Sequence, residues 1–223
     1  MKEHSPLIKT TTGRRLSRLR RAEREALERV LPELEISGNP EKLKRALKTY
    51  QRVVLEIGFG RGDFLYSRAK QDSDTLYIGV EVFLSGVAKL LRRMVNYDNQ
   101  NRPEPENILI STEDIRKVLA ELLPEDSLDR VYVLFPDPWP KKRHHKRRLL
   151  KRDFIGLLES RLKKGADIVV ATDSEDYAEE IYQNFKSSGF NCVDKDLIEV
   201  LSTKYAQKAQ DKGHRIFSFR FSK

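Results

Sequence analysis

Residues 53–62, VVLEIGFGRG, decide the fold of this chain. The apolar run 53–57 predicts a buried strand, and Gly58 predicts the turn that ends it. A helical pattern follows over residues 63–70, and residues 76–82, LYIGVEV, predict a second buried strand. Two buried strands joined through a helix make a βαβ unit, in which the strands must run parallel.

The alternation of strands and helices continues beyond this unit. Further strands are predicted at 107–111, 130–135 and 167–171, with helices at 84–95, 114–123, along the apolar stripe from Leu150 to Leu162, and around Tyr177 to Phe185. Two closing strands are expected near 190–201 and 215–221, joined by a loop at 202–214. We therefore expect an α/β fold with a Rossmann-like, mostly parallel, doubly wound sheet and a C-terminal antiparallel strand.

The 223 residues suffice for one such domain, and no internal repeat or second core is visible. We expect residues 1–30 to form a basic N-terminal arm and helix, and residues 31–223 to form a single domain. Within the first segment, residues 1–21 are expected to be a flexible arm and residues 22–31 a helix that ends at Pro32. Residues 96–106 are expected to be a polar loop.

The net charge of +9 is concentrated in two segments. Residues 1–30 carry nine Lys or Arg against four Glu, and residues 141–152 carry eight Lys or Arg and no acid, which leaves −4 for the rest of the chain. Such segments favour a polyanion, because each phosphate contact releases counterions. The alternative is a solubilising tail together with a solvated helix face, and for residues 1–30 the two interpretations stay open.

Composition also excludes several classes of protein. The single cysteine, Cys192, excludes a disulfide framework, and four scattered histidines argue against a metal site. No apolar run reaches the ~20 residues of a membrane span, and the N-terminus lacks the apolar stretch of a secretory signal. We therefore expect a cytoplasmic protein that does not bind membranes. The sequence does not decide between a monomer and a homodimer.

Acidic residues lie at or after the carboxyl end of every predicted parallel strand. These residues are Glu56, Glu81, Asp114, Asp137 and Asp173. Because the carboxyl ends of parallel strands meet at one edge of a sheet, we expect the five to converge there. Asp114 has an alternative interpretation, since it directly precedes a helix and is a typical N-cap residue.

The glycine-rich turn and these acids predict a nucleoside site. Gly58, Gly60 and Gly62 allow a tight turn and a close approach of a ligand to the backbone, and Glu81 is placed to accept hydrogen bonds from a ribose diol. The spacing differs from the dinucleotide pattern G-x-G-x-x-G, and the turn lacks the lysine of a triphosphate site. An acidic rim suits S-adenosylmethionine, which is cationic and has no phosphate.

The segment 134–148, LFPDPWPKKRHHKRR, joins this edge to the second basic segment. Its three alternating prolines predict a stiff, extended turn that presents Asp137 and Trp139. An aromatic ring beside a carboxylate suggests a base-binding pocket, although Trp139 has the alternative of a core residue. The cations expected to hold RNA phosphates are Lys141, Arg143, Lys146, Arg147 and Arg148.

The motifs PDPWPKKRHHKRR, LEIGFGRG, GVEV, ATDSEDYAE and TKY together resemble the bacterial tRNA (guanine-N7-)-methyltransferases, over about residues 14–221. The resemblance implies a class I S-adenosylmethionine-dependent methyltransferase fold, with S-adenosyl-L-methionine as cofactor and tRNA as partner. It implies transfer of a methyl group to N7 of guanosine at position 46, in the variable loop of tRNA.

The resemblance also implies roles for individual residues. The cofactor acids of the family match Glu56, Glu81, Asp114 and Asp137, and Asp137 is also the proposed catalytic position. The residues on the tRNA side match Lys141, Asp173, Thr203, Lys204, Tyr205 and Ala206. The family usually has Glu where Ala206 stands, which removes any carboxylate role at that position.

Two other functions stay open. One is a methyltransferase that acts on an exocyclic amine, and the other is a non-catalytic RNA-binding protein that would bind no S-adenosylmethionine. The glycine spacing disfavours a nicotinamide oxidoreductase. No residue is a convincing nucleophile or general base, because His144 and His145 lie among cations and Cys192 lies on a predicted strand.

Overall fold

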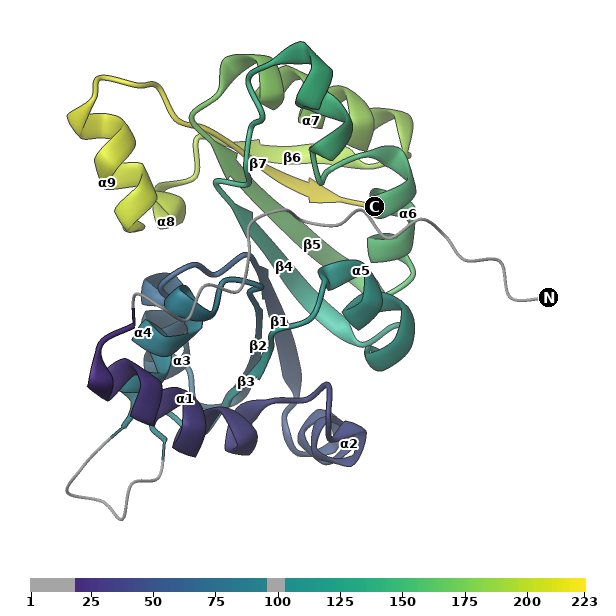
Figure 1. Ribbon diagram of the computed structural model, residues 1–223. Helices are drawn as coiled ribbons and strands as arrows, with labels where there is room; N and C mark the ends of the chain where they lie inside the picture. The colour runs from purple at the N-terminus through teal and green to yellow at the C-terminus, as the bar shows by residue number, and fades with distance from the viewer. Residues whose placement is uncertain (1–18, 96–102) are drawn as a thin grey trace.

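The computed structural model describes residues 19–95 and 103–223 (Figure 1). The arm expected at 1–21 and the loop expected at 96–106 lie for the most part outside the described residues. The helix expected at 22–31 is α1, Arg21–Leu34.

The described strands form one seven-stranded sheet in the order β3-β2-β1-β4-β5-β7-β6. The strands are β1 (Arg52–Ile57), β2 (Thr75–Val80), β3 (Ile108–Ser111), β4 (Leu128–Leu134), β5 (Leu162–Thr172), β6 (Asn191–Lys195) and β7 (Phe217–Ser222). The pairs from β3 to β5 are parallel, whereas β7 runs antiparallel to both of its neighbours. The expected doubly wound sheet with a C-terminal antiparallel strand is confirmed.

Helices cover both faces of the sheet (Figure 1). One face packs against α1, α3 (Asp63–Gln71), α4 (Leu84–Met94) and α8 (Ile198–Leu201). The other face packs against α2 (Pro40–Thr49), α5 (Ile115–Lys117), the π-helix η2 (Val118–Leu122), α6 (Arg152–Glu159) and α7 (Glu175–Ser187). From β1 the chain adds β2 and β3 on one side, and it then crosses over to add β4 and β5 on the other side. The carboxyl ends of β1 and β4, the strands at this switch point, form a crevice.

The alternation of side chains along β1 decides which residue points to which layer. Val53 and Leu55 join the core on the α2, α6 and α7 face, whereas Val54 joins the core on the α1, α3 and α4 face. Glu56 has the same parity as Val54 and therefore points toward the layer of α3 and α4. The carboxyl group of Glu56 is therefore buried, whereas we expected it at an open edge of the sheet from the sequence.

Two predicted helix boundaries were wrong, and one helix was missed. Pro32 does not end α1, because a proline in the last turn removes only one internal hydrogen bond and the buried side chain of Leu34 holds the helix on the core. The apolar stripe of α6 does not reach Leu162, which begins β5. Helix α2 was not expected, although Asn39 caps it and Pro40 stands at its first position.

The C-terminal prediction also needs correction. The strand expected at 190–201 ends at Lys195, and α8 follows it. The segment expected to be a loop contains α9, Lys204–Asp211, which is capped by the Thr203 hydroxyl and buries Ala206 and Ala209. Alanines make a weak apolar stripe, so the hydrophobic pattern did not reveal this helix.

Within the described residues, no helix is both long and apolar enough to cross a membrane. The division of the chain at residue 30 stays a prediction, although α1 runs across it and packs against α4.

Candidate functional site

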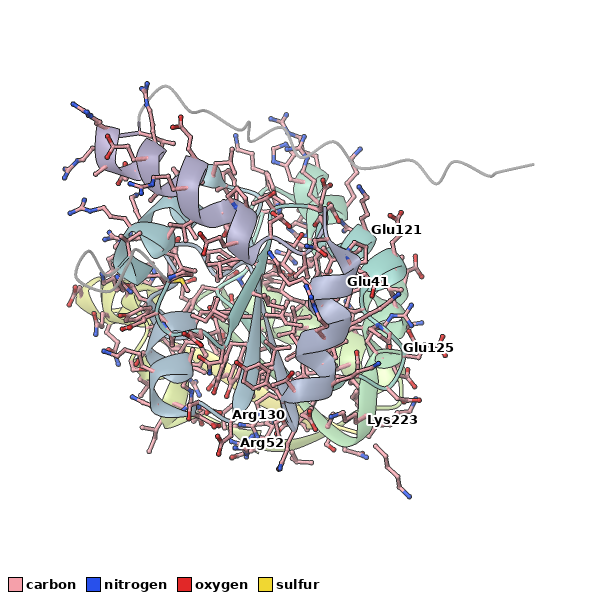
Figure 2. The ribbon with its side chains drawn as sticks, turned by 90° about the horizontal axis from the view of Figure 1, so that it is seen from below. Glu41, Arg52, Glu121, Glu125, Arg130 and Lys223 are labelled. Atoms are coloured by element: carbon pink, nitrogen blue, oxygen red, sulfur yellow. The ribbon has the colours of Figure 1, made fainter. Side chains whose placement is uncertain are left out.

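A cavity of about 480 Å³ opens at the carboxyl ends of β1, β2 and β4. Its lining includes three of the five predicted acids, namely Glu81, Asp114 and Asp137. The opposite end of the sheet is marked in Figure 2 by Arg52 and Arg130, which lie near the beginnings of β1 and β4. The cavity therefore occupies the switch-point crevice that the fold predicts.

The glycine-rich turn forms one wall of this cavity. Gly58 and Gly60 line it and have positive φ angles of 73° and 56°, which glycine adopts without strain. The amide of Gly60 donates a 2.8 Å hydrogen bond to Oε2 of Glu81, and the amide of Phe83 donates one of 2.8 Å to Oε1. Glu81 thus fixes the turn while its remaining lone pairs stay available to a ligand.

Gly62 does not line the cavity. It precedes α3 with a φ of 67°, and a Cβ at this position would lie 2.8 Å from side-chain atoms of Leu90. This glycine therefore allows α3 and α4 to pack closely. The structure supports a packing role here rather than the direct ligand contact expected from the sequence.

Glu56 lies behind the cavity and is 4% exposed. Burial first and the charge of Glu81 second raise the pKa of its carboxyl to about 8, although a backbone hydrogen bond from Leu65 opposes the shift. Its Oε2 atom is buried without a hydrogen-bond partner among the described residues. Buried polar atoms are normally hydrogen-bonded, so this oxygen fits a polar group of a ligand bound beside the glycine-rich turn.

Glu81 and Asp114 differ in their surroundings. Burial raises the pKa of Glu81, and the hydrogen bonds from Phe83 and Gly60 counteract this effect. Asp114 caps α5 by accepting a 2.8 Å hydrogen bond from the amide of Arg116, and it also lines the cavity. Both interpretations of Asp114 are therefore compatible with its position.

The proline-rich turn presents Asp137 and Trp139 to the cavity, as expected. It is not extended throughout, because Phe135 and Trp139 have positive φ angles of 54° and 46°. The Trp139 ring is half-buried, and the guanidinium of Arg147 lies 4.9 Å from a ring centroid of its indole. Trp139 belongs to neither hydrophobic core cluster and is not fully buried, so the core interpretation of Trp139 is wrong.

The second basic segment forms the 3-10 helix η3, Lys142–Arg147, and is largely exposed. Lys141, Arg143, Lys146 and Arg147 are exposed, and Arg147 also lines the cavity. Their side chains are accessible to a polyanion, which is compatible with the expected phosphate contacts.

The prediction that Arg148 holds a phosphate is wrong. Its side chain is 1% exposed, and its guanidinium forms ion pairs with Asp176 and Glu180 of α7. Its Nε also donates a 2.9 Å hydrogen bond to the carbonyl oxygen of Pro138. Arg148 therefore anchors the proline-rich turn to α7.

Helix α9 brings one predicted residue to the cavity. Tyr205 lines it and stacks on Phe135 with 6.1 Å between the ring centroids. The Thr203 hydroxyl is used as a helix cap, Lys204 pairs with Asp63 at 3.1 Å, and Ala206 is fully buried. The side chain of Ala206 therefore does not contact a substrate in this conformation.

Asp173 does not line the cavity. It lies after β5, where one of its oxygens is 3.3 Å from Nδ1 of His214. The convergence of five acids is thus confirmed for Glu81, Asp114 and Asp137, whereas Glu56 lies beneath the site and Asp173 beside it.

Sequence reasoning missed Phe83 and Lys89, which also line the cavity. The position of Phe83, two residues after Glu81, could have indicated that it lies at the same edge of the sheet.

The fold and this cavity define a class of protein. The family described as a putative methyltransferase matches residues 50–219, which is most of the chain. Solved structures share the fold. They include an antibiotic-related methyltransferase, with a TM-score of 0.59, 22% identity and coverage of 83% of this chain and 94% of the other. Another is the 16S rRNA methyltransferase KamB, with a TM-score of 0.61, 17% identity and coverage of 81% and 91%.

Curated relatives narrow the class to one family. The tRNA (guanine-N(7)-)-methyltransferase of Nitrosococcus oceani is 36% identical over 219 residues, which cover 96% of this chain and 90% of that protein. The protein of the same name from Nitrosospira multiformis is 36% identical, with coverage of 100% and 98%. The chain belongs to the tRNA (guanine-N(7)-)-methyltransferase family.

Proposed function

We propose that this protein transfers a methyl group from S-adenosylmethionine to N7 of guanosine at position 46, in the variable loop of tRNA. The observation that carries the proposal is the cavity that combines Glu81, Asp114 and Asp137 with Trp139 and Arg147, the last of which belongs to the exposed basic helix η3. Acids suit a cationic methyl donor, and cations suit the RNA that receives the methyl group.

The residues of the cavity fit S-adenosylmethionine. Glu81 would accept hydrogen bonds from a ribose diol, and Asp114 would accept one from an adenine amino group. The exposed carboxylate of Asp137 supplies negative charge near the glycine-rich turn, and buried Glu56, which its raised pKa keeps protonated at neutral pH, supplies a neutral carboxyl group with one unpartnered oxygen. When bound, S-adenosylmethionine supplies a methyl group on a positively charged sulfur, which makes the methyl carbon electrophilic.

The transfer of the methyl group to N7 requires no acid or base catalyst from the protein. N7 of neutral guanine has a free lone pair, so no side chain must remove a proton from the base. This matches a site whose described lining holds neither cysteine nor histidine. Methylation leaves the base with a positive charge, and the Asp137 carboxylate would stabilise that charge as it develops. Trp139 and Tyr205 would hold the base by stacking.

The basic segment would position the tRNA. Lys141, Arg143, Lys146 and Arg147 would contact phosphates, and their attachment to the stiff proline-rich turn would fix the distance between the RNA backbone and Asp137. Asp173 and Lys204 would act from the border of the cavity, where Lys204 is partly neutralised by Asp63. The protein would act in the cytoplasm, where its substrate is found.

Calorimetric titration with S-adenosylmethionine tests the first part of this function. We expect binding by the wild-type protein and at least about 10-fold weaker binding by Glu81→Gln, since a hydrogen bond to a charged group contributes ~1.5–3 kcal/mol. Glu113→Gln is the matched control, because Glu113 is near Asp114 in sequence but does not line the cavity. Absence of binding by the wild-type protein would favour a non-catalytic RNA-binding protein instead.

A further inference from the structure

A second cavity, of about 660 Å³, lies beside the first. It is formed by the N-terminal end of α1, the helix α4 and the glycine-rich turn, and its lining is Arg20, Glu23, Arg61, Lys89, Arg92 and Arg93. Five of these six side chains are cations. We refer to this region as the α1–α4 basic cavity.

Three of the cations come from one face of α4. Lys89, Arg92 and Arg93 stand at positions i, i+3 and i+4, so their side chains are neighbours on the helix surface. Like charges at this spacing destabilise a helix by about 0.2–0.5 kcal/mol per pair. The arrangement is therefore unfavourable unless an anion neutralises it.

The acids nearby neutralise only part of this charge. Asp63 accepts a hydrogen bond from Arg93, forms an ion pair with Lys204 at 3.1 Å and lies 3.9 Å from Arg61. Burial acts to raise the pKa of Asp63, but the hydrogen bonds from Arg93 and Lys204 outweigh it, and the pKa is lowered. Asp63 is therefore already shared among three cations.

Glu23 is buried, and its Oε2 accepts a 2.9 Å hydrogen bond from the backbone amide of Arg20. Within residues 19–95 and 103–223, the side chains of Arg20, Lys89 and Arg92 form no ion pair. Arg20 and Arg92 are exposed, and Lys89 is half-buried. These three cations remain available to a ligand.

The α1–α4 basic cavity adjoins the first cavity, because Arg61 and Lys89 line both. Arg147 reaches the first cavity from a different element, η3. A nucleotide in the first cavity would thus have cations near it on two separate elements. An extended polyanion satisfies such an arrangement better than a small anion does, since it presents phosphates at successive positions.

We propose that the α1–α4 basic cavity binds backbone phosphates of the RNA substrate, as a second contact separate from the basic segment at 141–147. This inference rests on the proposed function and adds to it a site that adjoins the first cavity at Arg61 and Lys89. The contact is independent of base identity, because guanidinium and ammonium groups read the phosphates and not the base edges.

The double variant Arg20→Gln, Arg92→Gln tests the proposal, and Arg45→Gln, Lys48→Gln is its matched control. The control removes two positive charges from α2, and both residues are exposed. Helix α2, which carries Glu41, lies apart from the N-terminal end of α1 in both views (Figures 1 and 2). Both variants should bind S-adenosylmethionine like the wild-type protein and unfold at a similar temperature.

The measurement is the affinity for an unmodified tRNA transcript at several salt concentrations. The logarithm of the binding constant falls linearly with the logarithm of the salt concentration, and each lost phosphate contact reduces the magnitude of this negative slope by ~0.7–0.9. We expect the slope of the α1–α4 variant to fall by about 1.4–1.8 and its affinity at low salt to fall roughly 10-fold or more, whereas the control keeps the wild-type slope.

Two results would overturn the proposal, and they are distinguishable. If the wild-type protein binds tRNA and both double variants show its slope, the cavity holds no RNA phosphate and serves another partner, such as an acidic protein segment. If the wild-type protein binds no tRNA at any salt concentration, the proposed function fails as well.

Discussion

Gly86 of α4 stands directly against Gly60 of the glycine-rich turn: a Cβ on Gly86 would lie 2.1 Å from the carbonyl oxygen of Gly60. Both residues line the first cavity. The amide of the same Gly60 donates its hydrogen bond to Glu81. The position of the turn is therefore fixed on one side by α4 and on the other by a carboxylate of the site.

This contact predicts that Gly86→Ala displaces the turn. Overpacking of this kind typically costs about 1–3 kcal/mol, which lowers the melting temperature of a chain of this size by roughly 2–12 °C. The affinity for S-adenosylmethionine, measured by titration calorimetry, should fall with it. Gly156→Ala is the control, because Gly156 lies in α6 with no atom near its Cβ position, and alanine there should stabilise the protein by ~0.4–1 kcal/mol. Equal melting temperatures for the two variants would contradict this interpretation.

Replacement of Asp137 by alanine should strongly reduce catalysis without disrupting the fold. Asp137 is exposed in the proline-rich turn and carries no packing role. Loss of one electrostatic contact to a developing charge typically reduces kcat by about 10²–10³-fold. Methyl transfer to tRNA should fall by this amount, whereas tRNA binding, measured by filter retention, should stay within about 3-fold of wild type. A parallel loss of both would show that Asp137 serves RNA binding.

The buried carboxyl of Glu56 predicts a pH dependence of stability. Its pKa is raised to about 8, so between its ordinary pKa near 4.5 and pH 8 the folded state holds a proton that the unfolded state has released. Stability must therefore decrease as the pH rises through this window. Glu56→Gln removes the effect. Urea denaturation should show that the variant gains at least about 1 kcal/mol over wild type between pH 5 and 8, since one pKa unit corresponds to ~1.4 kcal/mol. If the difference in unfolding free energy between Glu56→Gln and the wild-type protein did not change with pH, the raised pKa of Glu56 would be refuted.

Arg147 and Arg148 are adjacent and should behave oppositely. Arg148 is buried against Asp176 and Glu180, so Arg148→Met should lower the free energy of unfolding by about 1–3 kcal/mol. Arg147 is exposed and its guanidinium lies over the Trp139 ring, so Arg147→Met should leave stability within ~0.5 kcal/mol and weaken tRNA binding. Thermal denaturation together with binding at fixed salt distinguishes the two. Equal stability of both variants would show that the ion pairs of Arg148 contribute nothing.

The sequence predicted the central part of the fold because its signals are local. Apolar runs such as 53–57 and 167–171 are long and bounded by turn residues, and the acids at the strand ends follow from the strand positions. The Asp114 position was predicted on the same grounds, together with its alternative role as a helix cap.

The failures come from contacts between distant segments. Arg148 is one of eight cations in its segment, and its burial depends on two carboxylates about 30 residues later in the chain. Glu56 was expected at an open edge, but the parity of β1 turns it toward α3 and α4. The α1–α4 basic cavity could not be predicted, because its cations come from three separate segments whose proximity depends on the packing of α1 on α4.

The most direct test of the account is the position of the methyl group in tRNA. An unmodified transcript with guanosine at position 46 is incubated with the wild-type protein and labelled S-adenosylmethionine, and a transcript with adenosine at that position serves as the control. Nuclease digestion and mass spectrometry of the nucleosides should give 7-methylguanosine from the first transcript and no labelled nucleoside from the second. A labelled exocyclic amine, a labelled adenosine or equal labelling of both transcripts would contradict the proposed function.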